Sequence, residues 1–404
     1  MTCRTDKNNI NLLGHSEQNI RLERLKALMA EAAIERALIR DNANIYYLTG
    51  RVFRGYIYID IALERPLYFV RQPKHLHCEA DSCLFFIRKP EEIANILSEN
   101  NIERQSPVAL ELDAINFSEA LRLSSCFGQT PEKNLSPLLR QSRAIKTLRE
   151  QDMLRASGVK QSFVYGRLPR YFREGMTDIE FQIEIERASR LEGCLGQFRV
   201  AGGDMELFMG NVLTGDNGDN PSPYDFAMGG EGADPSLPVG ANGTVIRPSK
   251  PVMVDVNGNY NGYMTDMTRM YISGNIPPEV EHANNVSIEI CNSLAAMMKP
   301  GVKASELYNK ALEIATAAGL ADNFMGHNSH AGFVGHGCGI EVNELPVLAP
   351  RSRDVLAEGN VIAVEPKFVI PGIGAVGIEN TYIVHKQAPA EVITTAPTEI
   401  TTLD

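Results

Sequence analysis

The first part of the chain alternates helix-like and strand-like hydrophobic patterns. Apolar residues recur at helical spacing over 17–35, and the short apolar runs RALIRD, IYYLTG, YIYIDIAL and PLYFV follow, with residues typical of turns between them. The strand-like CLFFIRK, the helix-like EEIANILSEN and the strand-like PVALEL continue the alternation. The pattern predicts an N-terminal α/β domain over 1–143 that opens with a helix and contains strands in the short apolar runs.

A second domain over 144–404 is predicted to begin with helices. Helical periodicity extends over 144–173, and Thr177 with Glu180 forms a capping-box pattern for a further helix that ends at about Leu191. The stretch 210–243 is rich in Gly, Asp, Asn and Pro, so we expect a long loop there that borders a site. The remaining predicted elements are helices over 279–298 and 305–318 and strands over 361–385.

Composition narrows the class of protein. A chain of 404 residues exceeds what one hydrophobic core usually supports, which agrees with two domains. The formal charge of -11 and the scattered basic residues argue against a nucleic-acid partner. No apolar run approaches the ~20 residues of a membrane span, and the polar start lacks a signal-peptide core. We therefore expect a cytoplasmic protein.

The seven cysteines are odd in number, widely spread and without a CxxC pair, so we expect reduced thiols rather than a disulfide framework. His75, His77, Cys78 and Cys83 lie close together, but their spacing is not that of a tetrahedral zinc site. We expect a surface loop at this point.

Two aspartates lie in apolar, strand-like surroundings in the stretch VDVNGNYNGYMTDMTRMYISG. Side-chain alternation puts Asp255 on one face of a strand with Asn257, and the turn NGNYNG would bring Asp266 back toward Asp255 across an antiparallel pair. Buried carboxylates repel and are costly, so a positive charge is expected between them. Neutralisation by Arg269 or Lys250, or exposure at an edge strand, remains an alternative.

Three more residues suggest that the positive charge is metallic. His336 lies among glycines in GFVGHGCGIEVNE, Glu365 lies in the apolar run VIAVEPKFVI, and Glu379 lies in GAVGIENTYIV. Together with the two aspartates they form a set of four carboxylates and one imidazole, which suits two divalent ions. Two such ions can activate water and polarise a carbonyl group.

This pattern resembles the metallopeptidase family with the pita-bread fold, which includes aminopeptidase P, prolidase, methionine aminopeptidase and creatinase. The resemblance covers about 144–393, and residues 1–143 resemble the creatinase/prolidase-type N-terminal domain, which points to the Xaa-Pro branch. The expected fold is thus an α/β N-terminal domain plus an α+β pita-bread C-terminal domain. The expected metal ligands are Asp255, Asp266, His336, Glu365 and Glu379.

The resemblance also implies roles for these residues. Asp255 would chelate one ion, Asp266 and Glu379 would bridge both ions, and His336 with Glu365 would complete the second ion. Glu365 is also the candidate general base. Manganese is the expected metal, with cobalt, iron or zinc as alternatives.

The chain departs from the family at positions around the metal. Asn343 and Gly332 stand where histidines are usual, Gly377 stands where an arginine is usual, and a histidine expected upstream of Asp255 has no counterpart. Asn343 can orient a substrate but cannot titrate near neutral pH. Only His327 and His330 lie near enough in the sequence to replace a missing histidine, and His330 is the candidate catalytic residue.

The resulting hypothesis is a homodimeric, metal-dependent hydrolase of short peptides or peptide-like amides, similar to Xaa-Pro aminopeptidase or prolidase. The alternative is a non-peptidase enzyme on the same scaffold, lyase-like or creatinase-like, because several family histidines are absent. A catalytically silent binding protein is a third possibility, but such a protein need not keep all five ligands.

Overall fold

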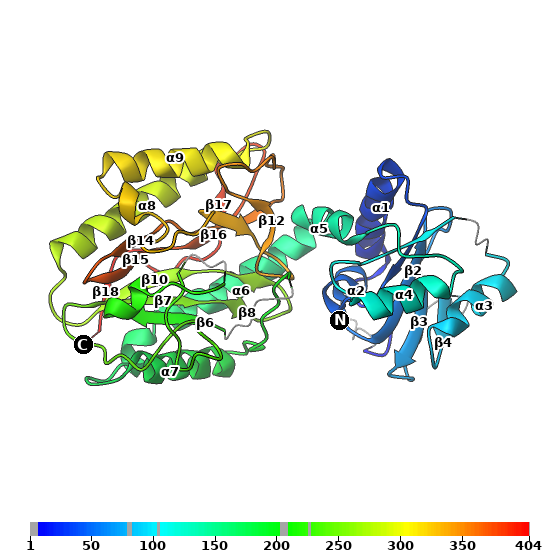
Figure 1. Cartoon of the computed structure of the whole chain (residues 1–404), viewed down its shortest axis with the longest axis horizontal. Helices are drawn as coiled ribbons and strands as arrows, with labels where there is room; N and C mark the ends of the chain where they lie inside the picture. Colours follow the sequence, from blue (N-terminus) through cyan, green and yellow to red (C-terminus); the bar gives the residue numbers. More distant parts are fainter. Residues whose placement is uncertain (1–6, 79–82, 103–105, 203–208, 225–227, 404) are drawn as a thin grey trace, which may run out of the picture. The chain divides into compact units, whose positions relative to one another are not determined.

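The computed structural model describes residues 7–78, 83–102, 106–202, 209–224 and 228–403. The chain divides into two compact units, Met1–Arg143 and Ala144–Asp404 (Figure 1). Each unit has its own sheets and its own buried side chains. Within the described part of the chain, no helix combines the length and the hydrophobicity needed to cross a membrane.

The N-terminal unit is built on one five-stranded sheet in the order β4-β3-β2-β1-β5. Strand β1 pairs antiparallel with β2 and parallel with β5. The strands are β1 (Arg36–Ile39), β2 (Arg54–Asp60), β3 (Leu67–Gln72), β4 (Leu84–Phe86) and β5 (Val108–Leu110). The helices are α1 (His15–Glu31), α2 (Asn42–Thr49), α3 (Glu91–Glu99), α4 (Phe117–Ser125) and α5 (Ser136–Ala144). This arrangement confirms the predicted α/β architecture.

One predicted strand is wrong, because the run IYYLTG belongs to helix α2. The side chain of Asp41 accepts a hydrogen bond from the Ala43 N–H at the start of this helix, and Gly50 ends it with φ +75°. An N-terminal cap and a left-handed glycine specify a helix even where the aromatic composition favours a strand.

The cysteine prediction also needs correction, because Cys78 and Cys83 form a disulfide bond. Cys126, Cys194, Cys291 and Cys338 are free thiols. The expectation of reduced cysteines therefore holds for these four but not for the pair that follows His77.

The C-terminal unit contains a four-stranded sheet in the order β18-β10-β7-β6 and a five-stranded sheet in the order β12-β11-β13-β16-β17. The first consists of β6 (Gly210–Thr214), β7 (Pro251–Val256), β10 (Thr268–Ile272) and β18 (Thr401–Thr402). The second consists of β11 (Gly335–Gly337), β12 (Glu344–Val347), β13 (Val361–Val364), β16 (Asn380–Ile383) and β17 (Glu391–Val392). Two hairpins complete the strands: β8 (Gly258–Asn259) with β9 (Met264–Thr265), and β14 (Lys367–Ile370) with β15 (Gly374–Gly377).

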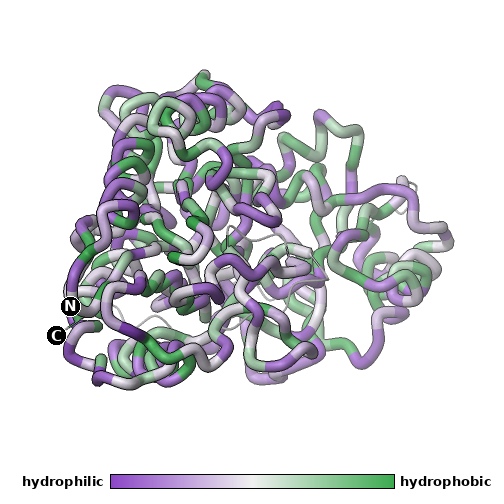
Figure 2. The backbone as a smooth tube through the Cα atoms, turned by 60° about the vertical axis from the view of Figure 1, so that its left-hand side comes forward, coloured by the Kyte–Doolittle hydropathy of each residue, from purple (hydrophilic) through white to green (hydrophobic). Residues whose placement is uncertain are grey.

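Helices cover the strands of this unit on two sides. Figure 1 shows α8 (Pro278–Met297) and α9 (Ala304–Ala317) on one side and α7 (Asp178–Leu191) on the other. Helix α6 (Leu148–Tyr165) contacts the β8–β9 hairpin. One hydrophobic cluster joins α8 and α9 to β13, β14 and β15, and a second joins α6 and α7 to β7. Hydrophobic and hydrophilic segments alternate along the helices, as Figure 2 shows.

The sequence predicted most of these elements. Thr177 and Glu180 make both hydrogen bonds of the capping box, and α7 ends at Leu191 as expected. The stretch 210–243 differs, because it begins with strand β6 and not with a loop. Strand β6 pairs with β7 from Gly210 to Thr214, so long-range pairing overrides the local turn-like composition.

Candidate metal centre

The two aspartates converge through the predicted hairpin. Asp255 lies in β7 directly opposite Thr268 of β10, and Asp266 lies in the connection between β9 and β10. The sequence suggested one continuous strand for the second arm of the hairpin. The structure instead divides this arm into β9 and β10. The Asp266 N–H donates to Thr381 Oγ1 at 2.9 Å, and Thr381 Oγ1 donates to the Asp266 carbonyl at 2.8 Å. These two bonds fix the backbone of Asp266 against β16.

His336 and Glu365 come from neighbouring strands of the other sheet. His336 lies in β11, and Glu365 follows β13 with its N–H donated to the Val334 carbonyl at 3.0 Å. His336 Nδ1 lies 3.1 Å from the Gly337 carbonyl, while Nε2 lies 3.3 Å from Glu365 Oε1 and 4.0 Å from Asp266 Oδ2. A donated Nδ1–H leaves Nε2 free to bind a metal.

Glu379 completes the set from the connection between β15 and β16. Its Oε2 accepts a hydrogen bond of 2.9 Å from Thr268 Oγ1. Its Oε1 is buried without a hydrogen-bond partner among the residues that the structure describes. A buried carboxylate oxygen without a partner is costly, and a bound cation would remove that cost.

The five predicted ligands form two overlapping groups. One contains Asp266, His336 and Glu379, and the other contains Asp255, Glu365 and Glu379; in each group the ligand atoms lie within 4.8 Å of one another. The structure thus brings together all five side chains. Neither alternative partner neutralises the aspartates, because Arg269 donates to backbone carbonyls and the Asn380 side chain, and Lys250 donates to the Gly372 carbonyl.

Lys367 is the cation that the sequence analysis overlooked. Its fully buried Nζ lies 2.7 Å from Asp255 Oδ2, 2.7 Å from Glu365 Oε2 and 3.8 Å from Glu379 Oε2. The ammonium therefore lies within the second group of carboxylates. Burial alone would lower the pKa of Lys367, but Asp255, Glu365 and Glu379 outweigh burial and raise this pKa well above its usual value.

The pKa values separate the two groups of ligands. Burial, reinforced by Asp255, raises the pKa of Asp266 to about 7, and burial, reinforced by Asp266, raises the pKa of Glu379 well above its usual range. Burial would also raise the pKa of Glu365, but Lys367 and then His336 outweigh it and lower this pKa to about 2. The carboxyl groups of Asp266 and Glu379 therefore hold their protons more tightly than usual, whereas Lys367 and His336 keep Glu365 ionised.

His336 belongs to the group that contains Asp266 and Glu379. Burial alone would lower the pKa of His336, but its bond to Glu365 and the charge of Asp266 raise it to about 9. The imidazole and the two carboxylates, of which Glu379 has an Oε1 without a hydrogen-bond partner among the described residues, fit one divalent ion. The second group does not fit an ion in the same way, because Lys367 already supplies its cation.

The other predicted catalytic residues have different partners. Asn343 is held by the backbone of Ala201: its Nδ2 donates to the Ala201 carbonyl at 2.9 Å, and its Oδ1 accepts the Ala201 N–H at 2.7 Å. The exposed His330 has its Nδ1 2.9 Å from the Phe324 carbonyl and lines a cavity of about 80 Å³ with His327 and Asp219. Catalytic roles for Asn343 and His330 stay predictions.

One residue of the site, Lys367, was missed by the sequence reasoning. Lys367 was visible as a lone lysine in the apolar run VIAVEPKFVI, two positions after Glu365. Asn257 follows β7 on the same face as Asp255, is buried, and has neither amide atom hydrogen-bonded within the described residues. A polar residue in an apolar run was the signal for Lys367, whereas Asn257 was already placed beside Asp255 by the alternation of the strand.

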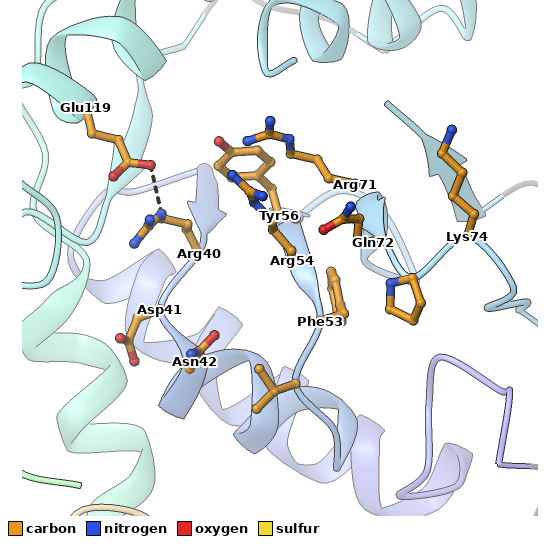
Figure 3. Close-up of a pocket in the computed structure, with 13 residues that line it drawn as sticks. Arg40, Asp41, Asn42, Phe53, Arg54, Tyr56, Arg71, Gln72, Lys74 and Glu119 are labelled. Atoms are coloured by element: carbon orange, nitrogen blue, oxygen red, sulfur yellow. Dashed lines mark ion pairs between the residues drawn. The ribbon is translucent and has the colours of Figure 1, made fainter. Parts of the chain in front are cut away.

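A larger cavity of about 1000 Å³ lies in the N-terminal unit (Figure 3). Its lining includes four cations, Arg40, Arg54, Arg71 and Lys74, and two acids, of which Glu119 pairs with Arg40 at 2.7 Å. None of the five predicted metal ligands lines this cavity. It is therefore distinct from the candidate metal centre.

Comparison with known families gives two matches in this chain. Residues 152–386 match the model of metallopeptidase family M24, and residues 21–145 match that of the creatinase/prolidase N-terminal domain. The first match covers more than half of the chain and contains all five predicted ligands. The expected resemblance is confirmed.

Individual relatives are similar over nearly their whole length. The chain is 25% identical to the Xaa-Pro dipeptidase of Pyrococcus furiosus over 368 residues, which cover 90% of this chain and 94% of the relative. The structure matches the Xaa-Pro dipeptidase from Bacillus anthracis with a TM-score of 0.77 and 24% identity, covering 95% of this chain and 99% of the other. It matches the X-Pro aminopeptidase of Thermotoga maritima with a TM-score of 0.75 and 23% identity, covering 94% and 99%. These matches confirm the predicted two-domain fold class.

Proposed function

Because this chain belongs to metallopeptidase family M24, we propose that it is a metal-dependent hydrolase that cleaves short peptides of the Xaa-Pro type or peptide-like amides. The observation that carries the proposal is the group Asp266, His336 and Glu379, whose ligand atoms lie within 4.8 Å of one another. The relatives named for Xaa-Pro peptides favour a peptidase over the lyase-like or creatinase-like alternative.

The chain's own residues supply binding and orientation. Asp266, His336 and Glu379 would hold a divalent ion, with Glu365 beside His336 at 3.3 Å. When bound, such an ion polarises a substrate carbonyl and lowers the pKa of water. Thr268 orients Glu379 through its 2.9 Å hydrogen bond. Glu365 is the proposed proton acceptor, since its Oε1 faces the ligand group while its Oε2 is held by Lys367.

Several finer properties are proposed from the sequence and its resemblance. Manganese is the proposed ion, with cobalt, iron and zinc as alternatives, because affinity alone does not select the native metal. The number of ions is treated in the next subsection, because Lys367 bears on it. A homodimer is proposed from the resemblance. The predicted location, the cytoplasm, has the four free thiols in its favour and the Cys78–Cys83 disulfide against it.

A substrate panel tests the proposed activity. Protein freed of metal with a chelator and reconstituted with Mn²⁺ is assayed on Xaa-Pro dipeptides, on tripeptides with proline in the second position, and on matched peptides without proline. We expect metal-dependent hydrolysis of at least one Xaa-Pro peptide. Bound metal without cleavage of any peptide would refute the peptidase proposal and favour the non-peptidase alternative.

Variants test the site assignment. Asp266→Asn and Glu379→Gln should each abolish the metal-dependent activity, because each removes the charge of a ligand. Asp322→Asn, a change of the same kind at an exposed position of the C-terminal unit, is the matched control and should keep full activity. Full turnover by either site variant would remove these residues from the metal centre.

A further inference from the structure

The ammonium group of Lys367 forms ion pairs with the predicted metal ligands. Its side chain is fully buried, and two of its three possible donors are directed at carboxylates, at 2.7 Å from Asp255 Oδ2 and 2.7 Å from Glu365 Oε2. These lengths are those of charge-assisted hydrogen bonds. Glu379 Oε2, at 3.8 Å, faces the same ammonium. The three carboxylates that meet at Nζ are the members of the second ligand group.

The local backbone holds Lys367 in place. The Lys367 carbonyl accepts the Met325 N–H at 2.8 Å, and the Lys367 N–H points to Met325 Sδ at 3.5 Å. Lys367 pairs with Gly377 across the β14–β15 hairpin. A Cβ at position 377 would lie 3.2 Å from Lys367 Cγ and 2.8 Å from Lys367 Cα. The glycine therefore leaves the space that the stem of the lysine occupies.

A divalent ion bound by the second group would need the volume of the ammonium. Metal–oxygen bonds to carboxylates are about 2.0–2.2 Å long, so an ion among Asp255, Glu365 and Glu379 would lie where Nζ now lies. Two cations cannot share this volume, and a buried lysine that lost its carboxylate partners would be left as an uncompensated charge.

We propose that Lys367 is the second cation of this centre: its ammonium fills the position formed by Asp255, Glu365 and Glu379, and the chain binds one divalent ion, at Asp266, His336 and Glu379. This inference rests on the proposed metal-dependent function, because it states how many ions that function uses. The sequence alone predicted two ions for the same five ligands.

The charge balance of the centre agrees with one ion. Four carboxylates carry four negative charges, of which one ion and one ammonium neutralise three. The remaining negative charge is no larger than what a buried, hydrogen-bonded carboxylate can carry when the Thr268 hydroxyl and the Met267 N–H donate to the site. Lys367 also supplies its charge permanently, whereas a second ion could dissociate.

Metal stoichiometry tests the proposal without an activity measurement. Chelator-treated protein is dialysed against excess Mn²⁺, freed of unbound metal, and analysed for manganese per chain. We expect about one ion per chain for the unmodified protein and about two for Lys367→Ala, which vacates the second position. Lys367→Arg keeps a cation and should bind about one, as should Lys386→Ala, which removes an exposed lysine outside the centre.

A spectroscopic titration provides an independent count. Co²⁺ added to the chelator-treated protein should give visible absorption that stops rising at about one equivalent in the unmodified protein, and at about two equivalents in Lys367→Ala. A second equivalent that binds in the unmodified protein would overturn the proposal while leaving the proposed hydrolase function intact. No bound ion in the unmodified protein would instead refute the metal-dependent function, and this inference with it.

The unmodified protein decides the question even if Lys367→Ala does not fold. Its ion count requires no variant, and Lys367→Arg preserves a positive charge at the buried position. If Lys367→Ala folds and still binds only one ion, Lys367 does not exclude the second ion, and the proposal is wrong.

Discussion

The buried ion pair between Lys146 and Glu344, next to strand β11, leads to a prediction about the stability of the protein. Lys146 Nζ lies 2.9 Å from Glu344 Oε2, and the two side chains are 1% and 2% exposed. Glu344 begins β12, opposite Gly337 of β11, the strand that carries His336. The pair therefore holds a strand that borders the candidate centre.

Lys146→Met removes the ammonium and keeps most of the volume of the stem. The buried carboxylate of Glu344 then loses the Lys146 ammonium, and breaking a buried pair in this way costs about 3–5 kcal/mol. With a denaturant slope of about 3 kcal/mol per molar urea, the unfolding midpoint falls by about 1 to 1.7 M. Far-UV circular dichroism in a urea series measures this change, since the chain has no tryptophan.

The matched control is Lys310→Met, in the same unit. Lys310 Nζ lies 2.8 Å from Glu313 Oε1, but these side chains are 35% and 69% exposed, so we expect a loss of no more than about 0.5 kcal/mol. Adding Glu344→Gln to Lys146→Met should recover much of the loss, because both charges of the pair are then removed. The reasoning fails if Lys146→Met lowers the midpoint no more than the control does, or if the double variant is no more stable than the single variant.

Two further predictions concern the ligands and the response to acid. Thr268→Val removes the hydrogen bond to Glu379 Oε2 and should weaken Mn²⁺ binding about 10- to 100-fold in equilibrium dialysis; unchanged affinity would contradict the orienting role. Arg155 lowers the pKa of Glu391 to about 2, against the effect of burial and with help from His385. Because this pKa is lower in the folded state than in the unfolded state, the pair stabilises the protein above about pH 4.5, and this contribution is lost as the pH falls toward 2. Urea midpoints of Glu391→Gln should therefore fall less between pH 6 and pH 3 than those of the unmodified protein, and parallel curves would contradict the pair.

Local signals in the sequence predicted the elements that local signals control. The capping box at Thr177 fixed the start of α7, and the predicted helices 279–298 and 305–318 differ by one residue at each end from α8 and α9. The run IYYLTG was wrong because its cap residue, Asp41, lies outside the apolar run. Strand β6 was missed because only pairing with β7, distant in the sequence, makes it a strand.

Some residues of the site could likewise be recognised from the local sequence, whereas the contacts of others depend on the fold. Each of the five ligands was recognisable as an acid or histidine in a segment that should be buried, and the structure brings all five together. Asn343 and His330 were chosen for their positions in the sequence. Their hydrogen bonds to Ala201 and Phe324 could not be predicted from residue spacing. The Cys78–Cys83 bond likewise depends on a fold that the spacing does not specify.

The sequence predicted two metal ions because it assigned all of the positive charge in the site to metal. Four buried carboxylates require positive charge, and that requirement is physical, but it does not state which cations supply the charge. Two divalent ions satisfy it, and so do one ion and one buried ammonium. Lys367 lies in the same apolar run as Glu365: the acid directly follows β13, and the lysine that pairs with it is the first residue of β14. The number of buried acids therefore predicts that positive charge is bound among them. The number of metal ions can be predicted only after the buried lysine and arginine side chains near those acids have been identified.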